Sequence, residues 1–242
     1  MAKIFVHCGM GIDEKLLIIR RNDFLAQLSP GDYEALGIVH NFIMADRNAY
    51  IYFDAQHFNK LFFVKEGYVK IGNTDDEGNE VIRDILQPGD VFGQITLERS
   101  NNMRGEFAQA CKSDVSLCAF TTDDFERLLQ VRPDLAVHFS KKVGQKQRHI
   151  ENRLLNLLQK DVRTRLLFFF WTLLRHHNGE QGNSLTLSNY LTHEDIARLT
   201  GTSRQTVTTL ISQFAADGLL EVDRRHIVIH DIKSLQKQAK VG

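Results

Sequence analysis

The segment from Leu191 to Val222 constrains the fold of this 242-residue chain most strongly, because it predicts two short helices joined by a tight turn. Thr192 is expected to cap the first helix, with Asp195 as its reciprocal partner three residues later. Gly201 interrupts the helical pattern at the point where the chain must turn. The segment therefore has the form of a helix-turn-helix unit.

The second helix of this segment has two chemically different faces. Thr202 or Ser203 is expected to cap it, since Thr202 and Gln205 have the spacing of a capping box. The apolar residues fall at helical spacing on one side: Val207, Leu210, Ile211 and Phe214. The other side carries neutral or basic hydrogen-bonding groups: Arg204, Gln205, Thr208, Thr209 and Ser212. A face of this kind suits the DNA major groove. The alternative is an ordinary amphipathic helix pair with a solvated face.

A predicted hairpin follows the second helix. The apolar runs Leu219–Val222 and Ile227–Ile229 flank a short basic tip, Asp223–His226. A hairpin in this position is a wing, and its side chains Arg224 and Arg225 are placed to contact phosphate.

These features resemble the winged helix-turn-helix of the cyclic-AMP receptor protein/FNR superfamily of bacterial regulators, most closely in the run Gly-x-Ser-Arg-Gln-Thr-Val from Gly201 to Val207. The resemblance implies a DNA-binding set: Thr202, Ser203, Arg204, Gln205, Thr208, Thr209, Ser212, Arg224 and Arg225. Arg204, Gln205 and Thr209 occupy positions that the family usually fills with Arg, Glu and Arg. Arg204 keeps the reach to a guanine, whereas Gln205 favours adenine over the cytosine that Glu selects. Thr209 is too short to replace Arg, so the preferred DNA site should differ from the common one.

Short strands dominate the chain from Phe42 to about Ala119. Strand-like runs alternate with turn signals at Glu66-Gly67, Asp75–Asn79 and Pro88–Asp90, which predicts an antiparallel roll or barrel. The order Gly67…Gly89-Asp90-x-Phe92-Gly93 resembles the cyclic-nucleotide-binding β-roll of the same superfamily.

The resemblance also points to an effector pocket, with candidate residues Gly93, Gln94, Arg104, Gly105 and Ile150. In the cyclic-AMP branch, a Gly-Glu pair and an Arg-Ser pair bind the ribose and the cyclic phosphate. This chain has Gly93-Gln94 and Arg104-Gly105 instead, and Ile150-Glu151 replaces the Thr-Ser that contacts adenine. Cyclic AMP is therefore not the expected effector. Alternatively, Arg104 forms a structural pair with Glu106 or Glu98, in a roll that binds another ligand or none.

A long helix is predicted from Pro133 to about Gln159, after a shorter helix that Thr122 is expected to cap. Its seam alternates steps of four and three: Ala136, Ser140, Val143, Gln147, Ile150, Leu154 and Leu157. The seam indicates either packing on its own domain or a coiled pair. The resembled family uses this helix for dimerisation, so the expected dimer interface is Val143, Gln147, Ile150, Leu154 and Leu157. A further helix is expected from Arg163 to about His176, beyond a hinge at Asp161-Val162.

Composition and motifs exclude several function classes. No serine, cysteine or lysine lies in a nucleophile motif, and the histidines lack ligand spacing, so neither catalytic nor metal-binding residues are expected. The N-terminal cysteines that hold an iron–sulfur cluster in one branch of the family are missing, and only Cys8 lies there. Three unclustered cysteines and the absence of a signal-peptide pattern predict a cytoplasmic protein. From Lys160 onward there are 11 Lys and Arg against 8 Asp and Glu, although the whole chain is neutral, which favours DNA contact by the C-terminal part.

The sequence as a whole predicts an α+β protein with three regions: an antiparallel β-roll sensor at 1–122, helices including the dimerisation helix at 123–160, and a winged helix-turn-helix at 161–242. The expected function is that of a homodimeric, sequence-specific transcriptional regulator of the cyclic-AMP receptor/FNR type. It would bind double-stranded DNA at a pseudo-palindromic operator, and the resemblance adds RNA polymerase as a partner. Two alternatives stay open: a ligand-binding or interaction module that no longer reads DNA, and a ligand-independent DNA-binding protein with a vestigial roll. Activation and repression are equally compatible with the sequence.

Overall fold

The computed structural model describes residues 4–7, 41–53, 59–95, 105–174 and 182–240. The chain forms two compact units, Met1–Gln147 and Arg148–Gly242. Three sequence expectations lie outside the described residues: the role of Cys8, the place of Arg104 in the effector pocket, and the pairing of Arg104 with Glu98.

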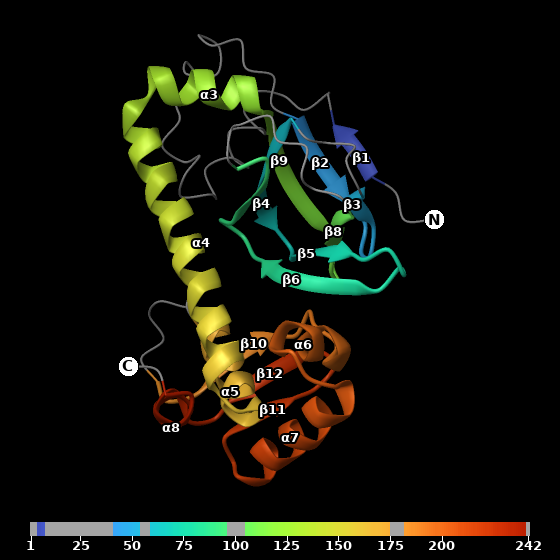
Figure 1. Ribbon diagram of the computed structural model, residues 1–242, viewed down its shortest axis with the longest axis vertical. Coiled ribbons are helices and arrows are strands. Elements are labelled where there is room, and N and C mark those ends of the chain that lie inside the picture. Colours follow the sequence, from blue (N-terminus) through green and yellow to red (C-terminus); the bar gives the residue numbers. More distant parts are fainter. Residues whose placement is uncertain (1–3, 8–40, 54–58, 96–104, 175–181, 241–242) are drawn as a thin grey trace. The chain divides into compact units, whose positions relative to one another are not determined.

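The described part of the first unit forms two antiparallel sheets (Figure 1). The five-stranded sheet has the order β1 (Ile4–His7), β2 (Asn41–Ala45), β9 (Val115–Thr121), β4 (Lys60–Glu66) and β7 (Val91–Gly93). The four-stranded sheet has the order β3 (Tyr50–Phe53), β8 (Glu106–Ala110), β5 (Val69–Thr74) and β6 (Glu80–Leu86). This arrangement confirms the predicted antiparallel roll.

Strand β4 is buried on both faces, which explains its unbroken apolar run. Phe62 and Val64 contribute to a core shared with the four-stranded sheet, together with residues such as Tyr52 and Leu86. Alternate residues such as Phe63 face a second core, formed with the helices that follow β9. A strand whose two faces are both covered needs apolar side chains at successive positions.

Two helices follow the roll, α3 (Thr122–Val131) and α4 (Pro133–Gln159). The predicted extent of the long helix is confirmed. The predicted cap of the shorter helix was displaced by one residue, because Thr121, not Thr122, has extended backbone angles and accepts a hydrogen bond from the Asp124 N–H at 3.1 Å. Phe125 and Leu128 of α3 pack with Leu135 and Phe139 of α4 in the second core.

In its described residues, the second unit contains the end of α4, four further helices and a small sheet. The helices are α5 (Val162–Leu173), α6 (His193–Thr200), α7 (Arg204–Ala216) and α8 (Ile232–Gln238). The antiparallel sheet has the order β10 (Leu185–Ser188), β12 (His226–Ile229) and β11 (Leu220–Val222). Asp161 caps α5 and accepts a hydrogen bond from the Thr164 N–H at 2.8 Å, which holds the pKa of its carboxyl below the usual range. The order of these helices and of the small sheet confirms the predicted winged helix-turn-helix.

None of the helices in the described ranges combines the length and the apolar character that crossing a bilayer would require.

Candidate nucleic-acid interface

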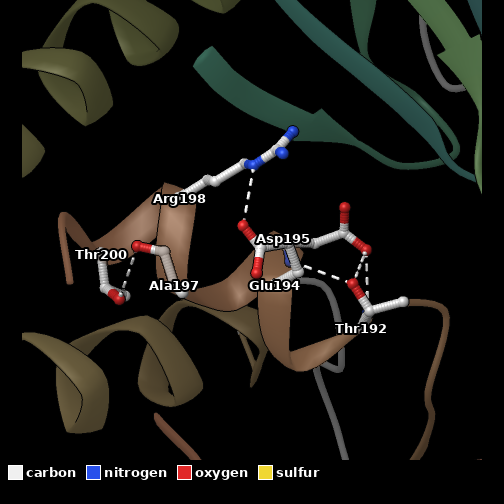
Figure 2. A network of polar contacts seen from close by, with 6 residues as sticks. All are labelled: Thr192, Glu194, Asp195, Ala197, Arg198 and Thr200. Atoms are coloured by element: carbon white, nitrogen blue, oxygen red, sulfur yellow. Dashed lines mark hydrogen bonds and ion pairs between the residues drawn. The ribbon is translucent and has the colours of Figure 1, made fainter. Parts of the chain in front are cut away.

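Helix α6 begins with the reciprocal cap that the sequence predicts. The Asp195 N–H donates to the Thr192 hydroxyl at 3.0 Å, and the Thr192 N–H donates to the Asp195 carboxylate at 2.8 Å (Figure 2). Two of the N–H groups that a helix start leaves unpaired are thus satisfied. The cap fixes the residue at which α6 starts, and therefore the angle at which the chain enters it.

The turn between the two helices depends on Gly201, which adopts a left-handed conformation with φ 64°. A side chain there would be strained, and its Cβ would lie 3.0 Å from a methyl carbon of Leu157. Of the two expected caps of α7, the structure selects Ser203, whose hydroxyl accepts from the Thr206 N–H at 3.1 Å. The capping box expected between Thr202 and Gln205 was wrong, because α7 starts one residue later than that pairing requires.

The two faces of α7 match the sequence pattern closely. Val207, Ile211 and Phe214 are buried, while Leu210 is only half-buried at the edge of that stripe. The predicted DNA-contacting side chains of this helix are all exposed: Arg204, Gln205, Thr208, Thr209 and Ser212. Ser203 is exposed as well, and Thr202 is half-buried.

A contact between α6 and α7 involves a residue that sequence reasoning missed. His193 Nδ1 lies 2.9 Å from the hydroxyl oxygen of Thr208. The two residues are 15 positions apart, and no local pattern links them. His193 therefore fixes the side of α7 that faces α6.

The wing is closed by side chains as well as by its strands. The Asp223 N–H donates to the carbonyl of His226, and the Asp223 carboxylate accepts from the N–H groups of Arg225 and His226, both at 2.6 Å. These hydrogen bonds hold the pKa of the Asp223 carboxyl below its usual range. Asn189 also binds the tip, because its N–H donates to the Arg225 carbonyl at 2.7 Å. Arg224 and Arg225 are both exposed at this rigid tip.

Two arginines hold the C-terminal end of α6, and sequence reasoning missed both. Arg165 of α5 donates to the carbonyls of Thr200 at 2.9 Å and Gly201 at 3.0 Å, and Arg153 of α4 donates to the carbonyl of Leu199 at 2.8 Å. The last carbonyls of a helix lack intrahelical partners and carry partial negative charge. The guanidinium groups satisfy these carbonyls and position the turn of the helix-turn-helix.

The described part of the candidate effector site lies in the first unit. Gly93 ends β7 with φ 90°, and a Cβ there would lie 2.4 Å from the Lys60 carbonyl oxygen. Gln94 is 2% exposed, and its N–H donates to the same carbonyl at 3.0 Å. The two residues are adjacent, with Gly93 half-buried and Gln94 buried. Ile150 belongs to the second unit, and Arg104 lies outside the described residues.

Gly105 and Glu106 lie in the same candidate effector-binding segment of the β-roll. Gly105 has φ 68°, and a Cβ there would lie 2.3 Å from the Thr74 carbonyl oxygen, so the backbone excludes the serine of the cyclic-AMP branch. Glu106 is buried, accepts from the Tyr52 hydroxyl at 2.6 Å and forms an ion pair with Arg83. Burial, and then the Glu106 charge, raise the pKa of Tyr52, which keeps its hydroxyl protonated as a donor.

The predicted dimer residues differ in their surroundings. Ile150, Leu154 and Leu157 on the last turns of α4 are 56%, 55% and 37% exposed, and Gln147 is also exposed. Val143 packs against the helical core of the first unit. Leu155 and Leu158, which the heptad pattern omits, are 50% and 74% exposed beside that stripe.

The fold and the site together define a winged helix-turn-helix protein with an N-terminal β-roll of the cyclic-nucleotide-binding type. Residues 44–132 match the model of the cyclic nucleotide-binding domain, and residues 164–238 match that of the Crp-like helix-turn-helix domain. The transcriptional regulator SdrP of Thermus thermophilus is 30% identical over 182 residues, which cover 75% of this chain and 85% of that protein. The chain belongs to the CRP/FNR superfamily of transcriptional regulators.

Two further similarities agree with this family. The CRP-like cAMP-activated global transcriptional regulator of Mycobacterium tuberculosis is 25% identical, over 75% of this chain and 80% of that protein. The structure of FixK2 from Bradyrhizobium japonicum has a TM-score of 0.72 at 22% identity, covering 85% of this chain and all of that one. Since the curated relatives are transcriptional regulators, the expectation of a non-enzymatic, DNA-binding protein is confirmed.

Proposed function

We propose that this regulator acts as a homodimer that recognises a pseudo-palindromic DNA site through α7 and the wing. Arg204, Gln205 and Thr208 contact base edges, while Arg224 and Arg225 contact phosphates. Thr202 and Ser203, at the N-terminal end of α7, lie where a helix attracts phosphate oxygens. Ser212 extends the same exposed face by one turn.

The observation that carries this proposal is the exposed face of α7. Its core stripe is fixed by Val207, Ile211 and Phe214, so the opposite side must point outward. That side combines one cation with neutral hydrogen-bonding groups and has no acid, whereas a merely solvated face usually carries charges of both signs. Arg204 can form two hydrogen bonds to guanine, and Gln205 can form two to adenine.

Dimerisation accounts for a two-fold symmetric site. The exposed leucines at the end of α4 give one chain an apolar stripe, and a second copy would bury it. Two copies of α7 related by a two-fold axis would enter successive major grooves about 34 Å apart. This geometry requires half-sites separated by one turn of the DNA helix.

The effector is proposed to differ from cyclic AMP. Gln94 replaces a carboxylate that could accept from a ribose hydroxyl, Gly105 supplies no hydroxyl, and Glu106 adds a buried negative charge next to it. Glu106 is already paired with Arg83 and Tyr52, so it does not replace the missing partner of the ribose.

Selection of bound sites from a random DNA pool tests the proposal, followed by titration of wild type and variants. Arg204→Ala should cost about 1–3 kcal/mol on the selected site and relax the preference at one base pair per half-site. Arg225→Ala should weaken binding to all sequences alike and reduce the salt slope by about one per phosphate contact. Arg127→Ala, at an exposed position of α3, serves as the matched control and should leave affinity unchanged. If no palindrome is enriched, or if Arg204→Ala weakens every sequence equally, α7 does not read bases.

A further inference from the structure

Thr209 lies on the outward side of α7, opposite its core stripe. It lies two residues after buried Val207 and two before buried Ile211. Each residue turns an α-helix by about 100°, so this spacing puts Thr209 on the side opposite the core, next to Gln205. Thr209 is therefore directed at whatever α7 faces.

The hydroxyl groups on this face are already used as donors within the helix. Thr208, Thr209 and Ser212 donate to the carbonyls four residues earlier, at 3.0, 3.1 and 3.0 Å. A hydroxyl has one hydrogen, and once it is donated only lone pairs remain. The centre of α7 thus offers a DNA base no hydroxyl donor, but acceptors and the threonine methyl groups.

Thr208 and Thr209 differ in what else holds them. The Thr208 hydroxyl oxygen lies 3.0 Å from the Arg204 carbonyl and 2.9 Å from His193 Nδ1, and when it donates to the carbonyl, a protonated Nδ1 donates to it. Two hydrogen bonds fix Thr208 at the side of α7 that faces α6. Thr209 makes one such bond, to the Gln205 carbonyl, which turns its hydroxyl toward the helix and leaves its methyl group for contact.

We infer that Thr209 is a specificity-determining residue that recognises the C5-methyl group of a thymine through its own methyl group. This inference rests on the proposed reading of DNA by α7. Thymine alone presents a methyl group in the major groove, and a threonine methyl is a suitable apolar partner for it. The hydrogen-bonding information then comes from Arg204 and Gln205, and Thr209 adds an apolar contact beside them.

The test replaces one methyl group at a time in each partner. In the site selected from the random pool, each thymine of a half-site is exchanged in turn for deoxyuridine, which lacks only that methyl. At one position this should weaken wild-type binding about threefold to tenfold, the effect of losing one buried methyl contact. Thr209→Ser removes the methyl of the protein and should weaken binding by a similar factor. Because the two changes remove one shared contact, making both should cost little more than making either.

Thr209→Val keeps a methyl and removes the hydroxyl, so it should bind within about twofold of wild type and stay sensitive to deoxyuridine. Thr186→Ser removes the same methyl from an exposed threonine of β10 and should change neither affinity nor the deoxyuridine effect. Circular dichroism should show unchanged folding, since these positions are exposed.

Three results would overturn the inference. The selected half-site could contain no preferred thymine, or deoxyuridine could leave wild-type binding unchanged. The third is that Thr209→Val abolishes binding while Thr209→Ser retains it. In each case Arg204→Ala can still shift base preference, which would leave the proposed function intact. A pool without any enriched sequence would overturn both.

Discussion

At the scale of single residues, the β-roll differs from the cyclic-AMP-binding branch at Gly105 and Glu106. The surrounding structure makes both residues difficult to replace. Gly105 has a left-handed backbone and no space for a Cβ, so a serine hydroxyl cannot simply be restored there. Glu106 is neutralised by Arg83 and hydrogen-bonded by Tyr52, so its charge is built into the core. A buried carboxylate with such partners is expensive to displace.

Cyclic AMP should consequently bind weakly or not at all. The neutral Gln94 side chain replaces a charge-assisted hydrogen bond to ribose, and such bonds are roughly twice as strong as neutral ones. Titration calorimetry of the purified protein should show no saturable heat at micromolar nucleotide, with the cAMP-activated relative of M. tuberculosis as the positive control. A dissociation constant below 1 μM, on the order of 8 kcal/mol of binding free energy, would contradict this.

At the scale of the elements, α6 is held at both ends by different chemistry. Its start is fixed locally by Thr192 and Asp195, and its end is fixed by Arg153 and Arg165 from two other helices. Arg165 also donates to the Lys160 carbonyl at 3.0 Å, so one guanidinium joins the segment after α4 to the turn before α7. The position of α7 therefore depends on α4 and α5.

Removing this guanidinium should loosen the turn. Arg165→Ala leaves the carbonyls of Lys160, Thr200 and Gly201 without their donor, and hydrogen bonds to a charged group contribute about 1.5–3 kcal/mol each. Since Arg165 is half-buried, we expect a total loss of about 2–3 kcal/mol in unfolding free energy and weaker binding to the selected DNA. Denaturant unfolding and DNA titration measure the two effects.

Arg127→Ala is the control for this change, because Arg127 forms an exposed pair with Asp124 and should contribute less than about 1 kcal/mol. Equal stability of Arg165→Ala and wild type would show that the three carbonyls are satisfied equally well by water.

At the scale of the whole molecule, the end of α4 leaves an apolar stripe uncovered in a single chain. Ile150, Leu154 and Leu157 are exposed by a third to a half or more, and Leu158 beside them is the most exposed of the large apolar residues that the structure describes. A monomer would present this surface to water, whereas a parallel pair of α4 helices would bury it.

The double variant Leu154→Asp, Leu157→Asp should therefore run as a monomer of 27.8 kDa, because each buried leucine contributes roughly 1.5–3 kcal/mol and the new charges repel across the seam. Light scattering of wild type should give twice that mass. Val137→Asp, on an exposed part of the same helix outside the seam, should remain dimeric. A dimer mass that persists in the double variant would place the interface elsewhere.

The sequence by itself determined most of this fold, because most of its elements depend on interactions between residues close together in the chain. The alternation of the strands, the extent of α4, the cap of α6 and the two faces of α7 each follow from residues close together in the chain. The same locality explains the small errors, since adjacent hydroxyl residues such as Thr121 and Thr122, or Thr202 and Ser203, offer equivalent caps. Only the backbone angles of the folded turn distinguish them.

Only the tertiary structure decided the contacts between distant segments. Glu106 pairs with Arg83 and Tyr52, 23 and 54 residues away, and Arg165 reaches Thr200 across 35. His193 meets Thr208 because α6 packs beside α7, and neither residue belongs to a spacing motif. Such partners depend on how whole elements pack, which periodicity and capping signals do not encode. Local sequence patterns were therefore sufficient to predict the class of protein. The residues that hold its DNA-reading helix in place could be identified only from the folded structure.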